Sequence, residues 1–402
     1  MSELDISNLM TVAEATAIVD AVGLAPTTVE VPLGQSVGLC LAKDVRCDRD
    51  SPPFEKSLMD GYAVRRADLG RLPCELVLRG RIMAGQTAQR PLGAGETMAI
   101  MTGAPLPAGA DTVVPVEQAR LNEEFGKVRF DELPEVGRHV AGRGSEARAG
   151  SVVLQAGTRM GPAQIAVAAG VGAAELRVFA APRVAVLSTG DELVPIEQTP
   201  AAAQIRATNN AMLAALLARW NCRAVDLGIV RDDPQAIERA ISTGLEQDVL
   251  LVSGGMSVGE RDYVPGILRK LGAEMRITKL RIKPGKPFVF AQMPAGKFVF
   301  GLPGNPVSAF VCTVCLVRRL LERLGGGGPQ EHKRAAVAGC DLAANGPREF
   351  YQPAIVSGRS IVPLAWKGSA DIYTLARANA LMVRGADDPP QPAGAMVEYL
   401  DV

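Results

Sequence analysis

The sequence predicts a multidomain α/β protein in which a domain with a parallel-rich sheet and helices on both faces is accompanied by β-rich domains. Three observations support this prediction. The chain has 402 residues, more than one hydrophobic core usually spans. Strand-like and helix-like segments alternate between Arg183 and Leu324. Short β-prone pieces, punctuated by glycine and proline, fill residues 48–146 and the final segment after the linker Gly325–Pro329.

The first element expected along the chain is a helix beginning at Thr11, where a Thr-x-x-Glu capping box ending at Glu14 precedes an apolar pattern that reaches about Val22. In the alternating region, short apolar runs are separated by segments with helical spacing. This pattern implies a parallel sheet, because strands joined by helices run in one direction. The segments are Val184–Leu187, Asn210–Trp220, Arg223–Val230, Pro234–Glu246 and Val249–Val252.

The charge balance argues against two classes of partner. Lys and Arg total 43, as do Asp and Glu, so the chain lacks the broad basic surface with which proteins bind nucleic acids or anionic membranes. The apolar stretches Val184–Leu187 and Val307–Val317 are shorter than the roughly 20 residues needed to cross a bilayer. Met1–Met10 is polar and acidic, unlike a secretory signal. A cytoplasmic location is therefore expected, and any anion must be bound locally.

The sequence offers few cysteines or histidines in arrangements that would support thiol or imidazole chemistry. The seven cysteines are scattered and odd in number, so we expect reduced thiols. Cys312 and Cys315 have the spacing of a redox or metal motif, but their apolar surroundings favour a buried helix. His139 and His332 are the only histidines, so the chain offers little from which to build a zinc site or a histidine-based triad.

Glycine-rich or charged loops follow three of the expected strands, at the end of a parallel sheet where ligands bind. In the loop 298–308, Asn305 is expected to cap the following helix and Pro306 to begin it. The free N–H groups at that helix start suit an oxyanion, and Gly301 and Gly304 allow a ligand to approach the backbone. A plain capped turn is the alternative.

The other two loops carry hydroxyls, carboxylates and glycines. In the loop 187–193, neighbouring carboxylates could hold Mg²⁺, although the same acids would also suit the start of a helix. The loop 252–263 includes Ser253, Gly254 and Gly255 and is similar to a phosphate cradle. It lacks the Gly-Lys-[Ser/Thr] ending of a P-loop, which argues against an ordinary ATPase.

Charged segments near these loops complete the candidate site. Lys279, Lys283 and Lys286 lie close in sequence, and prolines stiffen the segment that holds the last two, which suits a fixed oxyanion. Solvated surface lysines are the alternative. Arg231–Pro234 adds an acidic pair at a helix start, with capping as its alternative. Carboxylates for a divalent cation, together with lysines and amides for an oxyanion, favour a metal-assisted group transfer.

Five motifs together resemble those of the molybdopterin molybdenumtransferases, a family that includes the gephyrin E domain. They occur in family order, and the resemblance covers nearly all of the chain. The motifs are Ser57–Val64 (SLMDGYAV), Met101–Pro105 (MTGAP), Ser188–Leu193 (STGDEL), Ser253–Gly255 (SGG) and Gly301–Pro306 (GLPGNP).

The resemblance implies an elongated, four-domain homodimer whose active site is shared between subunits. It implies adenylylated molybdopterin and molybdate as substrates, with Mg²⁺ present and AMP released as molybdenum joins the dithiolene. Other proteins of molybdenum cofactor biosynthesis become candidate partners. The implied domains are a linking and dimerisation domain (28–47 and 147–176), a β-rich domain carrying Asp60 (48–146), the α/β molybdopterin-binding domain (1–27 and 177–326) and a C-terminal β-domain (327–402).

Carried over position by position, the resemblance implies roles for individual residues. The catalytic positions are Asp60, Thr102, Glu192, Asp232 and Asp262. The substrate-binding positions are Ser188, Thr189, Gly190, Ser253, Gly254, Gly255, Lys279, Lys283, Lys286, Pro303, Gly304, Asn305, Pro306, Ser308, Arg348 and Ser369. The molybdate contacts among them are Lys283, Lys286, Ser308, Arg348 and Ser369. The candidate metal ligands are Asp191, Glu192, Asp232 and Glu146.

One segment departs from the family pattern. The family commonly has Arg-x-x-Gly-Glu-Asp, whereas this chain reads Ala141–Glu146 (AGRGSE). Glu146 is the candidate substitute for the aspartate, and its extra methylene moves the charge by about one bond. Ala141 removes a guanidinium, and the sequence leaves open whether Arg143 compensates.

Two other functions remain as alternatives. The first is a non-catalytic scaffold, as in the gephyrin branch, although no additional N-terminal domain is expected here and most of the charged cleft residues are present. The second is a molybdopterin adenylyltransferase, whose domain is similar to residues 177–326. Such an enzyme would not need the motif Met59–Tyr62 or the segment after Gly328.

Overall fold

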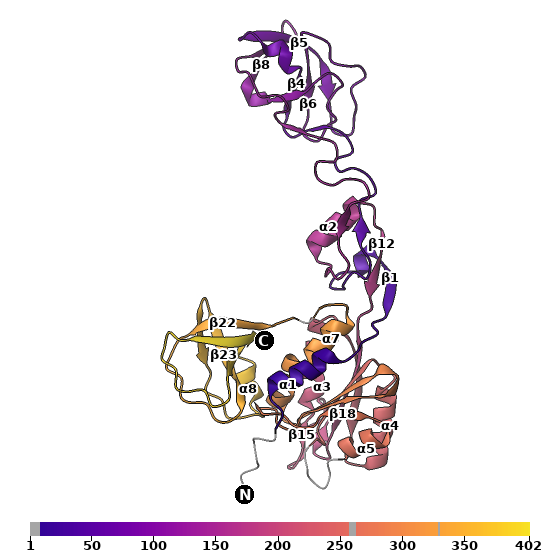
Figure 1. The fold of residues 1–402 in the computed structure, drawn as a ribbon, viewed down its shortest axis with the longest axis vertical. Helices are drawn as coiled ribbons and strands as arrows, with labels where there is room; N and C mark the ends of the chain where they lie inside the picture. Colours follow the sequence, from indigo (N-terminus) through magenta and orange to yellow (C-terminus); the bar gives the residue numbers. More distant parts are fainter. Residues whose placement is uncertain (1–8, 257–262, 329) are drawn as a thin grey trace.

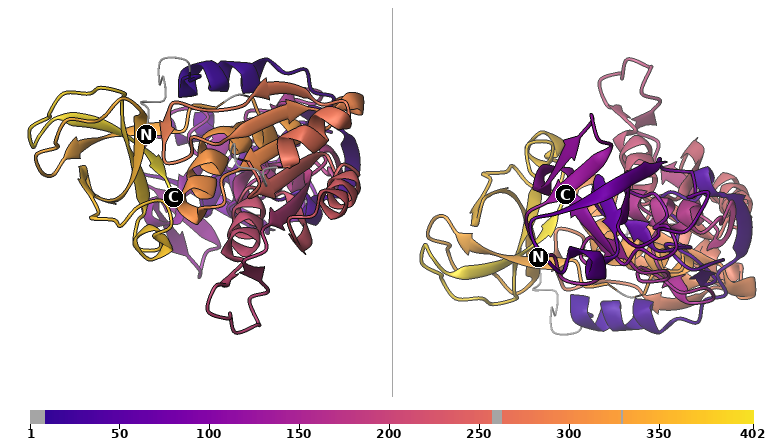
Figure 2. Two further views of the ribbon diagram at one scale, coloured as in Figure 1. Left: turned by 90° about the horizontal axis from the view of Figure 1, so that it is seen from below. Right: turned by 90° about the horizontal axis from the view of Figure 1, so that it is seen from above.

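The computed structural model describes residues 9–256, 263–328 and 330–402, and its α/β multidomain architecture agrees with the prediction (Figure 1). The molecule is elongated. The strands between residues 56 and 141 lie at one end, a small unit lies in the middle, and the α/β part with the C-terminal strands lies at the other end. Views along the long axis show that the C-terminal strands project to one side of the α/β part (Figure 2). Across the described ranges, no helix is both long and apolar enough to span a membrane.

The α/β part is built on a six-stranded sheet in the order β16-β13-β17-β21-β20-β18. The first four strands are parallel, and β20 and β18 join antiparallel, so the prediction of a parallel-rich sheet is confirmed. The strands are β13 (Arg183–Thr189), β16 (Arg223–Val230), β17 (Val249–Ser253), β18 (Glu274–Ile277), β20 (Val289–Gln292) and β21 (Phe298–Leu302).

Helices cover both faces of this sheet. Successive side chains of a strand point to opposite faces, so Val184 and Val186 of β13 enter one apolar cluster while Ala185 and Leu187 enter another. Helices α1 and α3 pack on the first face, and α4 and α5 pack on the second. The helices are α1 (Val12–Ala21), α3 (Thr208–Arg219), α4 (Pro234–Gly244) and α5 (Val264–Lys270).

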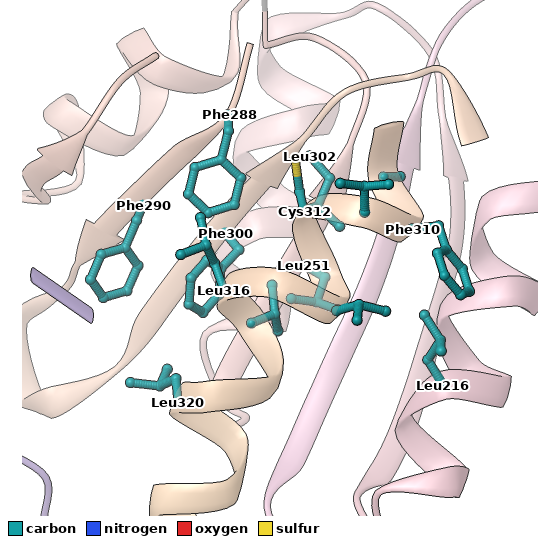
Figure 3. Packing of buried hydrophobic residues seen from close by; sticks show 14 of the residues in the cluster. Leu216, Leu251, Phe288, Phe290, Phe300, Leu302, Phe310, Cys312, Leu316 and Leu320 are labelled. Atoms are coloured by element: carbon teal, nitrogen blue, oxygen red, sulfur yellow. The ribbon is translucent and has the colours of Figure 1, made fainter. Parts of the chain in front are cut away.

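A continuous helical run fills the first face after β21. It consists of α6 (Pro306–Cys312), the π-helical segment η6 (Thr313–Val317) and α7 (Arg318–Leu324). The cluster around it includes Phe290 and Phe300, whose ring centroids lie 4.7 Å apart (Figure 3). Cys312 is fully buried here, and burial raises the pKa of the Cys312 and Cys315 thiols, so the prediction of a core helix is confirmed.

The N-terminal helix is held to the α/β part by its own cap and by α7. The capping box predicted at Thr11 is present, with the backbone N–H of Thr11 donating to Glu14 at 2.8 Å. At the other end, the Arg323 guanidinium donates to the Val19 carbonyl at 2.7 Å and to the Val22 carbonyl at 2.8 Å. These bonds satisfy carbonyls that the last helical turn would otherwise leave without partners.

The middle unit is formed by two chain segments that are distant in sequence. The antiparallel pair β1–β12 and the short pair β2–β11 join them, and α2 packs beside a small apolar cluster that includes Leu41 and Met160. The elements are β1 (Thr28–Pro32), η2 (Leu33–Gln35), β2 (Val45–Arg46), β11 (Val152–Leu154), α2 (Pro162–Gly170) and β12 (Glu175–Phe179).

The β-rich end contains a six-stranded sheet in the order β7-β4-β6-β5-β9-β8, with the short pair β3–β10 beside it. Two apolar clusters lie on its faces, one around Phe130 and one around Ile100. The elements are β3 (Lys56–Ser57), β4 (Gly61–Val64), η3 (Arg66–Leu69), β5 (Cys74–Ile82), β6 (Glu96–Ile100), β7 (Thr112–Pro115), η4 (Val116–Gln118), β8 (Ala119–Asn122), β9 (Lys127–Phe130) and β10 (Val140–Ala141).

The Glu96 carboxylate at the start of β6 forms ion pairs with two arginines. Arg90 lies 2.9 Å from one carboxylate oxygen, to which the N–H of Gly93 also donates at 3.0 Å, and Arg79 lies 2.9 Å from the other oxygen. The bond from Arg90, followed by that from Gly93, lowers the pKa of Glu96 from 4.5 to about 2.

This depressed pKa predicts a specific acid response. Because the folded-state pKa lies below the ordinary value, the carboxylate stabilises the fold above about pH 4.5, and this stabilisation is lost as the pH falls through about 2. Replacing Arg90 with glutamine should raise the pKa of Glu96 towards 4.5, measured by NMR titration of the side-chain carboxyl. Arg81→Gln is the matched control, since Arg81 is an exposed arginine on β5, the strand that pairs with β6. A pKa unchanged by Arg90→Gln would contradict this explanation.

The C-terminal strands close into a ring against the α/β part. The pairings β23–β24, β24–β22, β22–β26, β26–β25 and β25–β23 complete it, and β19 adds a strand from the α/β part. Tyr351 and Leu381 belong to the α/β core cluster, so the two parts share apolar packing. The elements are β19 (Ile282–Lys283), β22 (Lys333–Ala338), β23 (Glu349–Ser357), β24 (Ser360–Pro363), α8 (Ile372–Leu375), β25 (Ala380–Arg384) and β26 (Met396–Asp401). The short η5 (Pro294–Gly296) belongs to the α/β part, between β20 and β21.

Candidate functional site

A hollow of about 870 Å³ lies where β13, β17 and β21 end. The three loops named from the sequence meet there, because the carboxyl ends of parallel strands share one edge of the sheet. The predicted residues that line it are Ser188, Thr189, Gly190, Glu192, Asp232, Ser253, Gly254, Gly255, Pro303, Gly304, Asn305 and Pro306.

Buried polar side chains form the floor of this hollow. Asn209, in the first turn of α3, donates to the Ser253 hydroxyl at 2.5 Å and to the Gly304 carbonyl at 2.9 Å. The side-chain amide oxygen of Asn209 and the Thr189 hydroxyl are buried without a hydrogen-bond partner among the described residues. Buried polar atoms normally have partners, so these two are suited to a bound ligand.

Two glycines keep the wall of the hollow open. Gly254 has a φ of +92°, and a Cβ there would lie 2.4 Å from the carbonyl oxygen of Thr189. Gly255 has a φ of +64°, and a Cβ there would lie 3.0 Å from the Thr189 hydroxyl. Only glycine fits the first position, because neither the backbone oxygen nor the left-handed conformation tolerates a side chain.

The start of α6 differs from the sequence prediction in one respect. Pro306 begins the helix as predicted, but Asn305, although at the N-cap position, does not cap it through its side chain. The Asn305 amide instead donates to the Ser369 hydroxyl at 2.8 Å, and the Ser369 carbonyl accepts from the N–H of Val307 at 3.0 Å. The C-terminal part therefore supplies the cap and is joined to the hollow.

Three carboxylates lie at the mouth of the hollow or beside it. Glu192 and Asp232 line it, and the Asp191 carboxylate accepts from the N–H of Asp232 at 3.3 Å. The chain after Gly190 continues into the short strand β14 (Leu193–Val194), which pairs with β15 (Ile205–Arg206), so these acids do not begin a helix. In the segment Arg231–Pro234 the helix-capping alternative holds for Asp233, which caps α4 by accepting from the N–H of Ala236 at 2.7 Å.

The predicted basic cluster lies outside the lining of the hollow. Lys283 is exposed on β19, with its Nζ 4.5 Å from the centroid of the Phe350 ring. Arg348 donates to the neighbouring Ile282 carbonyl at 3.4 Å, so both cations flank the junction between the α/β and C-terminal parts. Lys279 and Lys286 are half-buried beside it, where the N–H of Leu280 donates to the Lys286 carbonyl at 3.0 Å.

Ser308 and Asp262 complete the predicted set in the α/β part. Ser308 is only 4% exposed, in the first turns of α6, and does not line the hollow. Asp262 lies outside the described residues.

Asp60 and Thr102 form a pair in the β-rich end. One Asp60 oxygen accepts from both the N–H and the hydroxyl of Thr102, each at 2.7 Å. These bonds, that from the backbone first, lower the pKa of Asp60 below its ordinary value, so the exposed carboxylate is ionised at neutral pH. No described residue of this end lines the hollow, and the middle unit separates the two regions (Figure 1).

Glu146 lies in this region too, apart from the other predicted metal ligands. Lys56 donates to one of its oxygens at 2.9 Å and Ser51 to the other at 2.9 Å, and the bond from Lys56 contributes most to lowering the pKa of Glu146. Arg143 instead pairs with Asp50 at 2.8 Å. Within the described ranges, no group of three His, Cys, Asp or Glu side chains is close enough to hold a metal ion.

The hollow also contains residues that the sequence analysis missed. Arg206 on β15 lines it and is the one cation among its described lining residues. Asn209 directly precedes the expected helix Asn210–Trp220, a position at which its amide could have suggested a ligand contact. Tyr373 of α8 also lines it, 81% exposed, although the sequence around it has no distinguishing motif.

Comparisons with known proteins agree with this architecture. Residues 10–172 match the model of the MoeA N-terminal region (domain I and II), residues 185–323 that of a probable molybdopterin binding domain, and residues 335–402 that of the MoeA C-terminal region (domain IV). The solved structure of the molybdopterin biosynthesis moeA protein from Pyrococcus horikoshii OT3 aligns with a TM-score of 0.86 at 25% identity, covering 98% of this chain and 100% of that one.

Sequence relatives carry the same family name. The molybdopterin molybdenumtransferase of Haemophilus influenzae is 38% identical over 303 residues, which is 75% of this chain and 74% of the relative. That of Staphylococcus epidermidis is 29% identical over 384 residues, or 92% of this chain and 90% of the relative. The chain belongs to the molybdopterin molybdenumtransferase family.

Proposed function

We propose that this protein transfers molybdate to adenylylated molybdopterin, releasing AMP, at a site completed by two copies of the chain. The observation that carries the proposal is the separation of two polar centres. One chain holds the ionised Asp60 carboxylate in its β-rich part and the glycine-walled hollow in its α/β part. These two parts lie at opposite ends of the molecule (Figure 1). In a homodimer with two-fold symmetry, each β-rich end can face the hollow of the other copy.

The hollow suits the phosphate-linked substrate. Its glycine-rich wall lets backbone N–H groups approach phosphate oxygens. Within the described part of the chain, the Thr189 hydroxyl and the Asn209 side-chain oxygen have no partner, so the first can donate to a phosphate oxygen and the second can accept from an N–H or O–H of the substrate. Arg206 adds a cation that can neutralise phosphate charge. We assign the substrate-binding role to the predicted residues that line the hollow together with these side chains.

Mg²⁺ is the divalent ion whose chemistry fits the acids beside the hollow. It usually binds one or two carboxylates together with substrate phosphates, and Glu192, Asp232 and Asp191 supply such carboxylates. When bound, the ion would neutralise charge on the pyrophosphate during its cleavage. Glu192 and Asp232 would orient it, while Asp60 of the second copy would accept a proton or bind a cation, since it is ionised.

Molybdate, a tetrahedral oxyanion, requires cations and hydroxyls close to the pterin. Lys283 and Arg348 flank the junction between the α/β and C-terminal parts, and Ser369 is held beside Asn305. We propose that these three bind molybdate at the edge of the hollow, with Lys286 and Lys279 adding positive charge. Ser308 would support this corner from within α6.

The middle unit, residues 28–47 and 147–176, is proposed as the dimerisation domain that places the two copies. Sedimentation equilibrium should then give about twice the chain mass of 42.2 kDa. We expect the enzyme to work in the cytoplasm.

The reaction itself can be tested directly. Incubation with adenylylated molybdopterin, molybdate and Mg²⁺ should release AMP and yield a pterin that contains molybdenum by metal analysis, and omission of Mg²⁺ or molybdate should suppress one or both products. Failure to release AMP would favour a non-catalytic scaffold. Adenylylation of molybdopterin with ATP would instead indicate an adenylyltransferase.

A further inference from the structure

Tyr373 is an aromatic side chain exposed to the hollow. It is 81% exposed, far more than most large side chains of a folded protein, and it is the one aromatic residue among the described residues that line the hollow. No hydrogen bond, ion pair or ring contact joins it to another described residue. A large exposed ring at the edge of a ligand hollow calls for an explanation, because tyrosine gains free energy by burial.

The helix that carries Tyr373 is firmly held. Asp371 caps α8 by accepting from the N–H of Thr374 at 3.1 Å and from its hydroxyl at 2.8 Å. Thr374 and Leu375, on the inner side of the helix, are buried, and Leu375 belongs to the α/β core cluster. The ring is therefore presented to the hollow from an anchored element, so a ligand that contacts it meets a preorganised surface.

A hydrogen bond between the segment before α8 and the opposite wall of the hollow further fixes the position of Tyr373. Ser369, four residues before Tyr373, accepts a hydrogen bond from the Asn305 side chain at 2.8 Å. Ala370 and Ile372 line the same hollow. Tyr373 thus forms part of one continuous wall, although it comes from the C-terminal part of the chain.

We propose that Tyr373 stacks on a planar heterocycle of the substrate. This inference rests on the proposed function, under which the hollow receives a molecule with two such rings, a purine and a pterin. The other walls offer hydroxyls, amides, carboxylates and Arg206, but no flat apolar face of that size. Stacking on an aromatic side chain contributes about 1–3 kcal/mol per base, and the ring requires no hydrogen bond to do so.

The test compares ligands with and without a ring. In calorimetric titrations of the dimer, Tyr373→Ala should weaken AMP binding by about 5- to 150-fold. Tyr373→Phe should retain most of the affinity, because it keeps the stacking face. Ribose 5-phosphate, which lacks the base, should bind both variants and the unmodified protein equally. Ile355→Ala, at a 41% exposed position on β23 away from the hollow, is the matched control.

An assay with adenylylated molybdopterin shows whether Tyr373 stacks on the purine or on the pterin. If Tyr373→Ala leaves AMP affinity unchanged but raises the KM for adenylylated molybdopterin with kcat nearly constant, the pterin is the stacked ring and the proposal holds. Unchanged affinity for both ligands would overturn it, as would loss of the dimer with ligand affinity intact, since Tyr373 would then contact the other copy. An unmodified protein that releases no AMP would instead refute the proposed function, which these variants do not test.

Discussion

Replacing Asp60 with asparagine is expected to slow the release of AMP from adenylylated molybdopterin by about 100-fold or more while leaving the protein folded. The amide oxygen of asparagine can still accept the two hydrogen bonds from Thr102, so the loop geometry is retained. The negative charge is lost, and with it the ability to accept a proton or bind a cation. Initial rates of AMP release and thermal unfolding followed by circular dichroism measure the two effects.

The control for this variant is Glu123→Gln. Glu123 is an exposed acid in the same β-rich end, in the turn between β8 and β9, and its removal should change neither the rate nor the melting temperature. A fully active Asp60→Asn variant would exclude a role for this carboxylate in the reaction. Unfolding of the variant would show that Asp60 serves the β-rich fold rather than the site.

Among the substitutions proposed for this protein, Gly254→Ala should lower the free energy of unfolding most. The new Cβ would lie 2.4 Å from the Thr189 carbonyl oxygen, at a φ of +92° that alanine rarely adopts. The backbone oxygen cannot rotate away, so the loop must shift, and we expect a loss of about 2 to 4 kcal/mol in the free energy of unfolding. The displaced loop should also abolish detectable AMP binding, because it forms one wall of the hollow.

Gly266→Ala provides the comparison. Gly266 lies within α5, and a Cβ there would meet no atom within 4 Å. Alanine has a higher helix propensity than glycine, so this variant should be at least as stable as the unmodified protein and should bind AMP normally. Denaturant unfolding and calorimetric titration distinguish the two glycines. Equal stability of both variants would show that the Gly254 loop is more adaptable than its geometry implies.

The sequence predicted the sheet and the position of the hollow because both depend on local patterns. Apolar runs alternating with helical segments identify parallel strands, and parallel strands place their terminal loops at one edge. Ser188, Ser253 and Gly304 therefore line one hollow although they are distant in sequence. The capping box at Thr11 was equally predictable, since all its partners lie within three residues.

Contacts between distant segments could not be predicted in this way. Asparagine is a residue type that often caps helices, yet the Asn305 amide donates to Ser369, more than sixty residues later. This contact forms because the C-terminal ring folds back onto α6. Tyr373 reaches the hollow for the same reason. The lysines near residue 283 were expected at the hollow, but the junction with Phe350 and Arg348 holds Lys283 outside its lining.

If each active site combines residues of two copies, as proposed, a mixture of two inactive variants should regain activity. Asp60→Asn and Glu192→Gln chains should each be inactive as homodimers. After unfolding and refolding as an equimolar mixture, half of the dimers contain one chain of each kind, and one of their two sites has both native residues. The mixture should therefore recover roughly one quarter of the native rate of AMP release. A mixture as inactive as its components would contradict a site shared between two chains.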